Sequence, residues 1–284
     1  EDALWGNDFE DPILGYRPYI NTRSFIDYFI VNEFARNVDG FKKSRNFHKD
    51  KDSKDSLIYA GPVWDFDWAY KDHDASMVNG SGWRHDYAGP TDVKPPGWYI
   101  RLLQDTTFAN ELACRYFNLR NSILDTASLF PYIDSLANVV DAAQERHFIR
   151  WPILGINVGT PEVGVQPTTY TGEITKFKGW ILDRLLWLDG NMPGHCPNVG
   201  IEESREKAPY FVVYPNPVGD VMNVYVNEPI NRLELYDISG KLVWSKFAFG
   251  QQLINIDVSR FSGVFTLKVQ LSGQKVLMKK VISY

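Results

Sequence analysis

The sequence predicts an α+β protein of two domains, a mainly helical domain followed by a seven-stranded antiparallel β-sandwich of immunoglobulin-like type. Apolar side chains recur at helical spacing through much of the first 197 residues, whereas short β-branched segments with period-two alternation fill residues 211–282. The charge changes at the same place, because residues from 211 onward carry eight Lys or Arg and five Asp or Glu in a chain of net charge −5. We therefore predict domains at residues 1–197 and 210–284, joined by a polar linker at residues 198–209.

Four long segments of the first domain have helical periodicity. They are TRSFIDYFIVNEFARN (22–37), ELACRYFNLRNSIL (111–124), LFPYIDSLANVVDAAQERHFIRW (129–151) and YTGEITKFKGWILDRLLWLDGN (170–191). In the first segment, Thr22 or Ser24 is the expected N-cap. Residues 72–98 are rich in Gly, Pro, Asn and Asp and have no period, which is typical of a functional or mobile loop.

The second domain contains short segments that alternate between apolar and polar residues. They are FVVYP, VMNVYV, RLELYD, KLVWSKF, LINIDV, GVFTLKVQ and KVLMKKVI. The turn sequences VGD, ISGK, RFSG and LSGQ separate them. Strands this short and this closely spaced are typical of a small β-sandwich.

Composition excludes several classes of protein. A hydrophobic content of 44% over 284 residues predicts a globular fold, and a pI of about 5.6 gives no general attraction to nucleic acid. The sequence has no transmembrane segment, and its start lacks the features of a signal peptide, so the protein is intracellular or its leader has been removed. Two cysteines are too few for an all-cysteine zinc site, and they leave free thiols or one disulfide as alternatives.

The segment GPVWDFDWAYKD, residues 61–72, places Asp65 and Asp67 among aromatic residues. An aspartate is costly to bury and is disfavoured in strands, so this pattern needs a compensating partner, of which a metal ion is one. The alternative is a strand with alternating faces that leaves both carboxylates in water. Asp39, in the upstream motif NVDG, has a similar alternative, since it can simply turn or cap the chain.

Two further groups of polar residues have weaker functional interpretations. A metal site in the irregular loop would use Asp72, His73, Asp74, His85 and Asp86, but such residues are common in polar loops. The lysines that follow Asp39 are expected to form a solvated face, with phosphate contact as the alternative. They are Lys42, Lys43, Lys49, Lys51 and Lys54.

Four motifs of the second domain occur in a specific order: YPNP (214–217), LYDISGK (235–241), IDVSRFSGVF (256–265) and KKVI (279–282). This order resembles the type A C-terminal sorting domain of the type IX secretion system of Bacteroidetes. The resemblance implies that the translocon recognises residues 210–284 and that the protein is secreted or attached to the cell surface. A plain accessory sandwich is the alternative. Export to an oxidising compartment would permit a disulfide between Cys114 and Cys196, and free thiols stay open.

Residues 20–192 resemble the CotH-like kinase family in its Bacteroidetes form. The resemblance rests on NVDG, KDKD and GPVWDFDWA, in that order, and on ERHFIRWPILG and KFKGWILDRLLWLDGN further along the chain. It implies a fold like a kinase C-terminal lobe for residues 1–197. It also implies a parent protein that uses ATP with Mg²⁺ or Mn²⁺ to phosphorylate a protein hydroxyl group.

The same resemblance implies roles for individual residues. Asp39 would be the catalytic carboxylate, with Ser44 five residues later, where protein kinases usually have asparagine. Asp65 would be the principal metal ligand, Asp67 a second ligand, and Trp64 would stack on the nucleotide base. Too few residues precede Asp39 to form the N-terminal lobe, so we expect this chain alone to be an incompetent kinase. The rival function is a secreted surface or binding protein that keeps the fold without activity.

Overall fold

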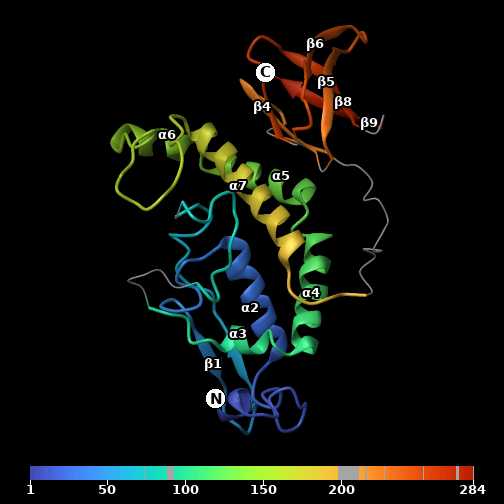
Figure 1. Ribbon diagram of the computed structural model, residues 1–284. Helices are drawn as coiled ribbons and strands as arrows, with labels where there is room; N and C mark the ends of the chain where they lie inside the picture. The colour runs from blue at the N-terminus through green and yellow to red at the C-terminus, as the bar shows by residue number, and fades with distance from the viewer. Residues whose placement is uncertain are drawn as a thin grey trace. The chain divides into compact units, whose positions relative to one another are not determined.

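The computed structural model describes residues 1–73, 75–87, 93–197, 211–214, 216–226, 228–251, 253–272 and 275–283. The chain divides into two compact units, Glu1–Ile201 and Glu202–Tyr284, and each is described by itself (Figure 1). The predicted linker at residues 198–209 lies outside the described residues. The domain boundaries expected from the sequence therefore stay predictions.

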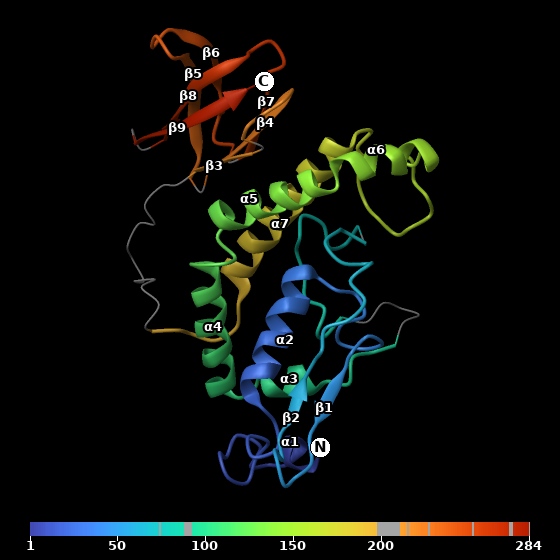
Figure 2. The ribbon, with the colours of Figure 1, turned by 180° about the vertical axis from the view of Figure 1, so that it is seen from behind.

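The regular secondary structure of the first unit is mainly helical, and the two views agree that α2 lies among the other helices (Figures 1 and 2). The helices are α1 (Asp2–Trp5), α2 (Thr22–Ala35), α3 (Trp98–Leu102), α4 (Thr106–Arg120), α5 (Thr126–Val139), α6 (Asp141–Arg150) and α7 (Tyr170–Asn191). A short antiparallel pair, β1 (Phe47–Lys49) and β2 (Ile58–Ala60), follows α2 in the sequence. Because α2 contacts α4, α7 and β2, it is the element around which the unit is assembled.

The start of α2 is set by Asn21, which lies just outside the segment with helical periodicity. Its Oδ1 atom accepts a hydrogen bond from the Ser24 backbone N–H at 2.9 Å, as an N-cap side chain does. The prediction of Thr22 or Ser24 as the cap is wrong: Thr22 is the first helical residue, and the Ser24 hydroxyl donates back to the Asn21 carbonyl. The helix ends at Ala35, and the following residue, Arg36, is its C-cap, with a left-handed φ of 51°.

Packing around α2 fixes the loop that follows it. The ring of Phe41 meets that of Tyr99 edge-to-face at 5.2 Å, and both side chains are buried. The Tyr28 hydroxyl donates to the carbonyl of Gly40 at 2.6 Å. A Cβ at residue 40 would overlap the side chain of Asn32, which is itself buried, so the close approach of loop and helix requires glycine there.

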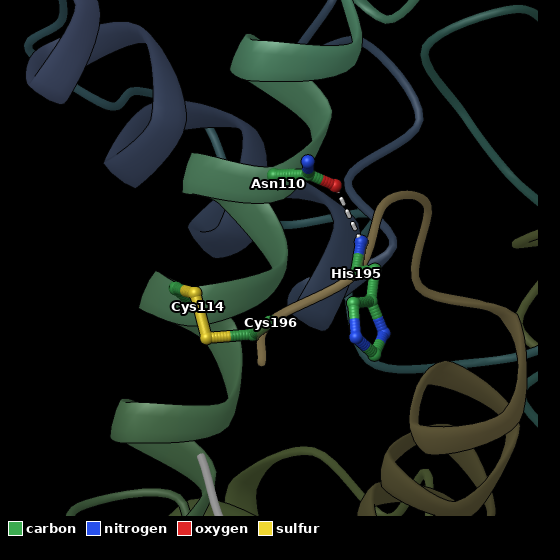
Figure 3. The surroundings of a disulfide bond; sticks show 4 residues. All are labelled: Asn110, Cys114, His195 and Cys196. Atoms are coloured by element: carbon green, nitrogen blue, oxygen red, sulfur yellow. Dashed lines mark hydrogen bonds between the residues drawn. A yellow bond between two sulfur atoms is a disulfide. The ribbon is translucent and has the colours of Figure 1, made fainter. Parts of the chain in front are cut away.

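A disulfide links α4 to the segment after α7. Cys114 lies within α4, and Cys196 lies five residues beyond the end of α7 (Figure 3). Next to it, the backbone N–H of His195 donates to Asn110 Oδ1 at 2.7 Å. Of the two alternatives that the sequence left open, the structure has the disulfide rather than two free thiols.

The second unit consists of two antiparallel sheets. One has the strand order β3-β4-β7 and the other β6-β5-β8-β9. The strands are β3 (Phe211–Tyr214), β4 (Val221–Val226), β5 (Ile230–Asp237), β6 (Leu242–Phe247), β7 (Leu253–Asp257), β8 (Gly263–Leu271) and β9 (Val276–Ser283). Inward side chains of both sheets share one apolar core, with Val224 and Leu267 among the fully buried ones. The protein thus has the predicted helical domain followed by antiparallel β-sheets.

In the part of the chain that the structure describes, no helix combines the length and the apolar character needed to cross a bilayer.

Candidate functional site

The loop after α2 carries Asp39 and is held in place by two buried asparagines. Asn37 donates from Nδ2 to Asn32 Oδ1 at 3.2 Å and to the Trp64 carbonyl at 3.4 Å. Its own Oδ1 accepts from the backbone N–H of Asp39 at 3.3 Å. The side chain of Asn37 therefore connects α2 and the adjoining Asp39 loop to the segment after β2, where Trp64 lies 27 positions further along the sequence.

Ser44 joins the two segments that contain the predicted site residues. Its backbone N–H donates to the Asp39 carbonyl at 3.0 Å, and its hydroxyl donates to Asp65 Oδ2 at 3.3 Å. Ser44 itself is buried. The structure thus brings the Asp39 backbone and the Asp65 carboxylate to Ser44, although the two aspartates are 26 positions apart in the sequence.

Asp65 has an uncommon backbone conformation. Its φ is 62°, in the left-handed region, and its side chain is exposed. Strand β2 ends at Ala60, so the alternative of a strand through residues 64–68 is wrong, although both aspartates are exposed to water as that alternative predicted. Left-handed backbone at a residue other than glycine costs on the order of 1 kcal/mol and is concentrated at functional sites, although aspartate tolerates it better than most residues.

Asp67 and Trp64 lie on the surface on either side of Asp65. The carboxylate of Asp67 is exposed in the turn that the Ala69 N–H closes on the Phe66 carbonyl at 3.1 Å. The indole of Trp64 is 66% exposed, which is unusual for so large an apolar group. An exposed indole next to carboxylates can stack on a planar ligand.

One of the lysines that follow Asp39 is not on the solvated face that the sequence predicts. The side chain of Lys42 is only 2% exposed, and its Nζ lies 3.6 Å from Asp39 Oδ1. Its predicted place on a solvated face is wrong, because packing covers its aliphatic stem. Lys49 and Lys54, in contrast, pair with Asp52 and Asp50 at the surface.

The donor set suits a metal that is bound together with a ligand. Within the described ranges, no three His, Cys, Asp or Glu side chains come together in a way that could hold an ion. Mg²⁺ is commonly held by only one or two carboxylates, with water and substrate phosphates completing its shell. Asp65 and Asp67 are both exposed, so their oxygen atoms are accessible to a metal that arrives with a ligand, whereas the described residues form no cage of protein side chains alone.

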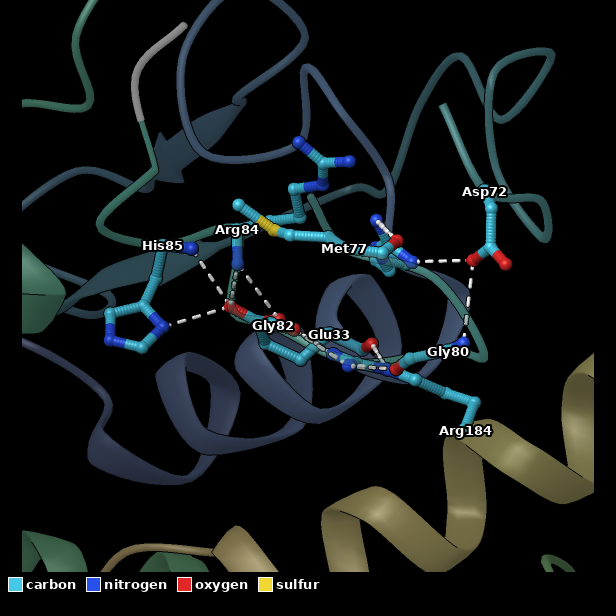
Figure 4. A network of polar contacts seen from close by, with 9 residues as sticks. Glu33, Asp72, Met77, Gly80, Gly82, Arg84, His85 and Arg184 are labelled. Carbon is cyan, nitrogen blue, oxygen red and sulfur yellow. Dashed lines mark hydrogen bonds and ion pairs between the residues drawn. The ribbon is translucent and has the colours of Figure 1, made fainter. Parts of the chain in front are cut away.

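A buried carboxylate on α2 organises the irregular loop. Glu33 accepts hydrogen bonds from the backbone N–H of Arg84 at 2.9 Å, from the backbone and Nδ1 of His85, both at 2.8 Å, and from Arg184 Nη2 at 3.0 Å (Figure 4). Burial raises the pKa of Glu33, but the His85 hydrogen bond and the Arg184 charge outweigh it, so the pKa is lowered. His85 therefore holds the loop to α2.

Asp72 has a similar structural role at the other end of the loop. It accepts from Arg36 Nη1 at 2.7 Å, from Trp180 Nε1 at 2.9 Å and from the Asn79 N–H at 2.8 Å. His73 stacks on Trp68 at 5.9 Å, and burial lowers its pKa to about 4.

The described residues of this loop therefore do not form the metal site that was considered from the sequence. Asp72 and His85 use their polar atoms to bind different protein partners. Asp86 is exposed, and Asp74 lies outside the described residues.

Sequence reasoning missed the residues that support these loops. Asn32 and Glu33 are adjacent polar residues inside the apolar helix FIDYFIVNEFA, and both are buried. Polar residues on a helix that is otherwise apolar on nearly all sides are a usable signal, because each needs a buried partner. The partner of Glu33, Arg184, is 151 positions away, and no local pattern indicates it.

These features define a two-domain protein. In its helical domain, Ser44 hydrogen-bonds to the Asp39 backbone and to the exposed carboxylate of Asp65, and its second domain is made of antiparallel sheets. The profile of the family described as CotH kinase protein matches residues 4–188, more than half of the sequence, and the chain belongs to this family. Residues 212–283 match the secretion system C-terminal sorting domain.

Comparison with solved structures finds seven matching chains. One of these chains comes from the crystal structure of CopC from Methylosinus trichosporium OB3b. Its sequence is 13% identical to this one, the TM-score is 0.20, and the match covers 26% of this chain and 91% of the CopC chain. No curated protein matches the sequence.

Proposed function

We propose that this protein is part of a secreted enzyme that transfers phosphate from ATP to a protein hydroxyl group. The observation that supports the proposal is the position of Ser44, which hydrogen-bonds to the Asp39 backbone and to the Asp65 carboxylate. Phosphoryl transfer needs one carboxylate that orients the attacking hydroxyl and others that hold the metal against the phosphates. The hydrogen bonds of Ser44 support the proposal because they hold the Asp39 loop next to the segment that carries the Asp65 carboxylate.

Each residue has a distinct role in this proposal. Asp39 orients the hydroxyl of the substrate, and Asp65 binds the metal with help from Asp67. Mg²⁺ or Mn²⁺ would supply positive charge to the phosphate oxygens. Ser44 keeps the Asp65 carboxylate in place, and the exposed ring of Trp64 stacks on the base. The rival function is a surface protein of the same fold that binds a partner without transferring phosphate.

Export is the second part of the proposal. The match of residues 212–283 to a sorting domain supports recognition of this unit by the type IX translocon of a Bacteroidetes cell, and hence secretion or attachment to the outer surface. Its two sheets are, in this view, an immunoglobulin-like sandwich of seven strands. The Cys114–Cys196 disulfide agrees with an oxidising destination.

Phosphate transfer by the full-length protein, measured with labelled ATP and Mg²⁺, tests the enzyme proposal. Asp39→Asn and Asp65→Asn should each lower the rate by about a hundredfold or more, the range expected for a positioned carboxylate. Asp50→Asn is the matched control, because its exposed carboxylate lies in the same region and contacts only the neighbouring Lys51 N–H, at 2.7 Å, and Lys54, at 3.7 Å, among the described residues. Full activity in Asp65→Asn would refute the site. ATP binding without transfer by the unmodified protein would favour the rival function.

A further inference from the structure

A pocket of about 500 Å³ lies on the helical unit, apart from the Ser44 site. It is bounded by residues 69–72, Asn79, residues 162–163 and one face of α7. The lining residues of α7 are Glu173, Lys176, Phe177, Gly179, Trp180 and Asp183. Most of them follow the spacing i, i+3, i+4, i+7 and i+10, so the helix presents a single stripe to the pocket.

Aromatic rings form one wall of this pocket. Tyr70 meets Phe177 edge-to-face at 5.4 Å and Trp180 edge-to-face at 6.0 Å. All three residues line the cavity. Aromatic faces attract cations through their quadrupole, and indole does so best.

The carboxylates of the pocket are only partly matched by protein cations. Asp72 is paired with Arg36, and Glu162 is paired with Lys176. The carboxylate of Asp183 makes no hydrogen bond or ion pair with any residue in the described ranges, although it is partly buried and lies near Asp72. A carboxylate removed from water without a partner is costly, so this position favours a positive charge supplied from outside.

The titration of the site supports the same conclusion. Burial, with a smaller contribution from the charge of Asp72, raises the pKa of Asp183 to about 6. Burial also raises the pKa of Glu173, against the effect of Lys176. Both groups would be stabilised in their charged form by a cation in the pocket.

The size of the pocket and its aromatic wall indicate an organic cation. The volume of the pocket falls in the range of small-molecule sites, which is roughly 300 to 1,000 Å³. The described residues place no three metal-binding side chains together. We propose that this pocket binds an ammonium or guanidinium group on a hydrocarbon stem, with Asp183 as its counter-ion and Trp180 and Tyr70 against the stem.

Such a group has two sources, a free amine or guanidine and a Lys or Arg side chain of a polypeptide. The chemistry at the pocket is the same for both, and the test separates them. The proposal does not depend on phosphate transfer, because none of its residues belongs to the Ser44 site.

Calorimetric titration of the full chain at pH 7.5 with butylguanidinium, and with its neutral isostere butylurea, tests the proposal. Butylguanidinium should bind and butylurea should not. Asp183→Asn should weaken binding of butylguanidinium by about tenfold or more, since it removes one partly buried charge and little else. Glu145→Gln, which removes an exposed carboxylate on α6, should leave the affinity unchanged.

A second arm compares acetyl-Gly-Arg-Gly-amide with the same peptide containing citrulline. Tighter binding of the arginine peptide than of butylguanidinium identifies a polypeptide side chain as the source, and the reverse order identifies a free cation. Equal binding by the unmodified chain and Asp183→Asn would overturn the proposal. So would failure of both cations to bind, or equal binding of the neutral isosteres.

The pH dependence gives an independent readout. Affinity for butylguanidinium should rise between pH 5 and pH 7 as Asp183 ionises, and this rise should be absent in Asp183→Asn. The other charged groups that face the pocket are Lys71 and Asp72 with Arg36 behind it, Glu162, and Glu173 and Lys176 of α7. A rise of the same size in Asp183→Asn would assign the titration to one of these and contradict the role of Asp183.

Discussion

Removal of the disulfide should destabilise the helical unit by a large and calculable amount. Cys114 and Cys196 are 82 positions apart, so their bond closes a long loop of the unfolded chain. Chain entropy for a loop of that length corresponds to about 4.5 kcal/mol at 25 °C. Replacing both residues with alanine removes this constraint, and the folded contacts of α4 otherwise stay the same. The double variant should therefore unfold at a lower temperature.

Calorimetry can measure the size of the shift. For a unit of 201 residues, an unfolding entropy of roughly 2.1 cal/mol/K per residue gives about 0.4 kcal/mol/K, so 4.5 kcal/mol corresponds to about 10 °C. The transition of the second unit is an internal control, because that unit has no cysteine. A reductant should lower the transition of the unmodified protein but not that of the double variant. A shift below about 2 °C, or equal sensitivity of both proteins to reductant, would refute the reasoning.

Other predictions follow from single residues. Because the pKa of Asp183 is raised to about 6, the folded state binds its proton more tightly than the unfolded state, and stability falls as pH rises from about 4 to about 6. Asp183→Asn should therefore stabilise the unit by up to about 3 kcal/mol at pH 8 and by almost nothing at pH 3, as urea titrations would show. Glu33→Gln should cost about 3 kcal/mol in the same assay, since it leaves Arg184 buried without its counter-charge, and a cost below about 1 kcal/mol would contradict this role. Gly40→Ala should cost about 1 to 3 kcal/mol by forcing the loop away from α2, which unchanged stability would disprove. Deleting residues 211–284 in the native host should trap the protein in the periplasm, and its appearance in the medium would show that the sandwich is not the sorting signal.

Periodicity predicted the elements well because their burial is regular. The apolar stripe of TRSFIDYFIVNEFARN became α2, and each alternating segment after residue 210 contains a strand of the two sheets. The cap of α2 was missed because Asn21, Thr22 and Ser24 can all cap, and only the backbone conformation decides among them. Lys42 was misplaced because hydropathy does not reveal that the stem of a charged side chain is packed.

Polar contacts between residues far apart in the chain could not be predicted from the sequence. The contact of Glu33 with Arg184 and the pairing of Asp72 with Arg36 and Trp180 depend on how the helices pack. No sequence pattern distinguished Asp183, whose carboxylate has no partner among the described residues, from the other charged residues of α7. The residues of the Ser44 site came from resemblance to a family, and spacing alone did not indicate that Ser44 would contact Asp65.

The central claim is that Asp65 helps to hold a metal–nucleotide at the Ser44 site. Electron paramagnetic resonance of Mn²⁺ with ATP in the full-length protein tests this claim most directly. We predict a protein-bound Mn²⁺ signal that requires ATP, is lost in Asp65→Asn, and persists in Asp183→Asn, because Asp183 lies in the separate pocket on α7. An unchanged signal in Asp65→Asn, or its loss in Asp183→Asn alone, would contradict the account.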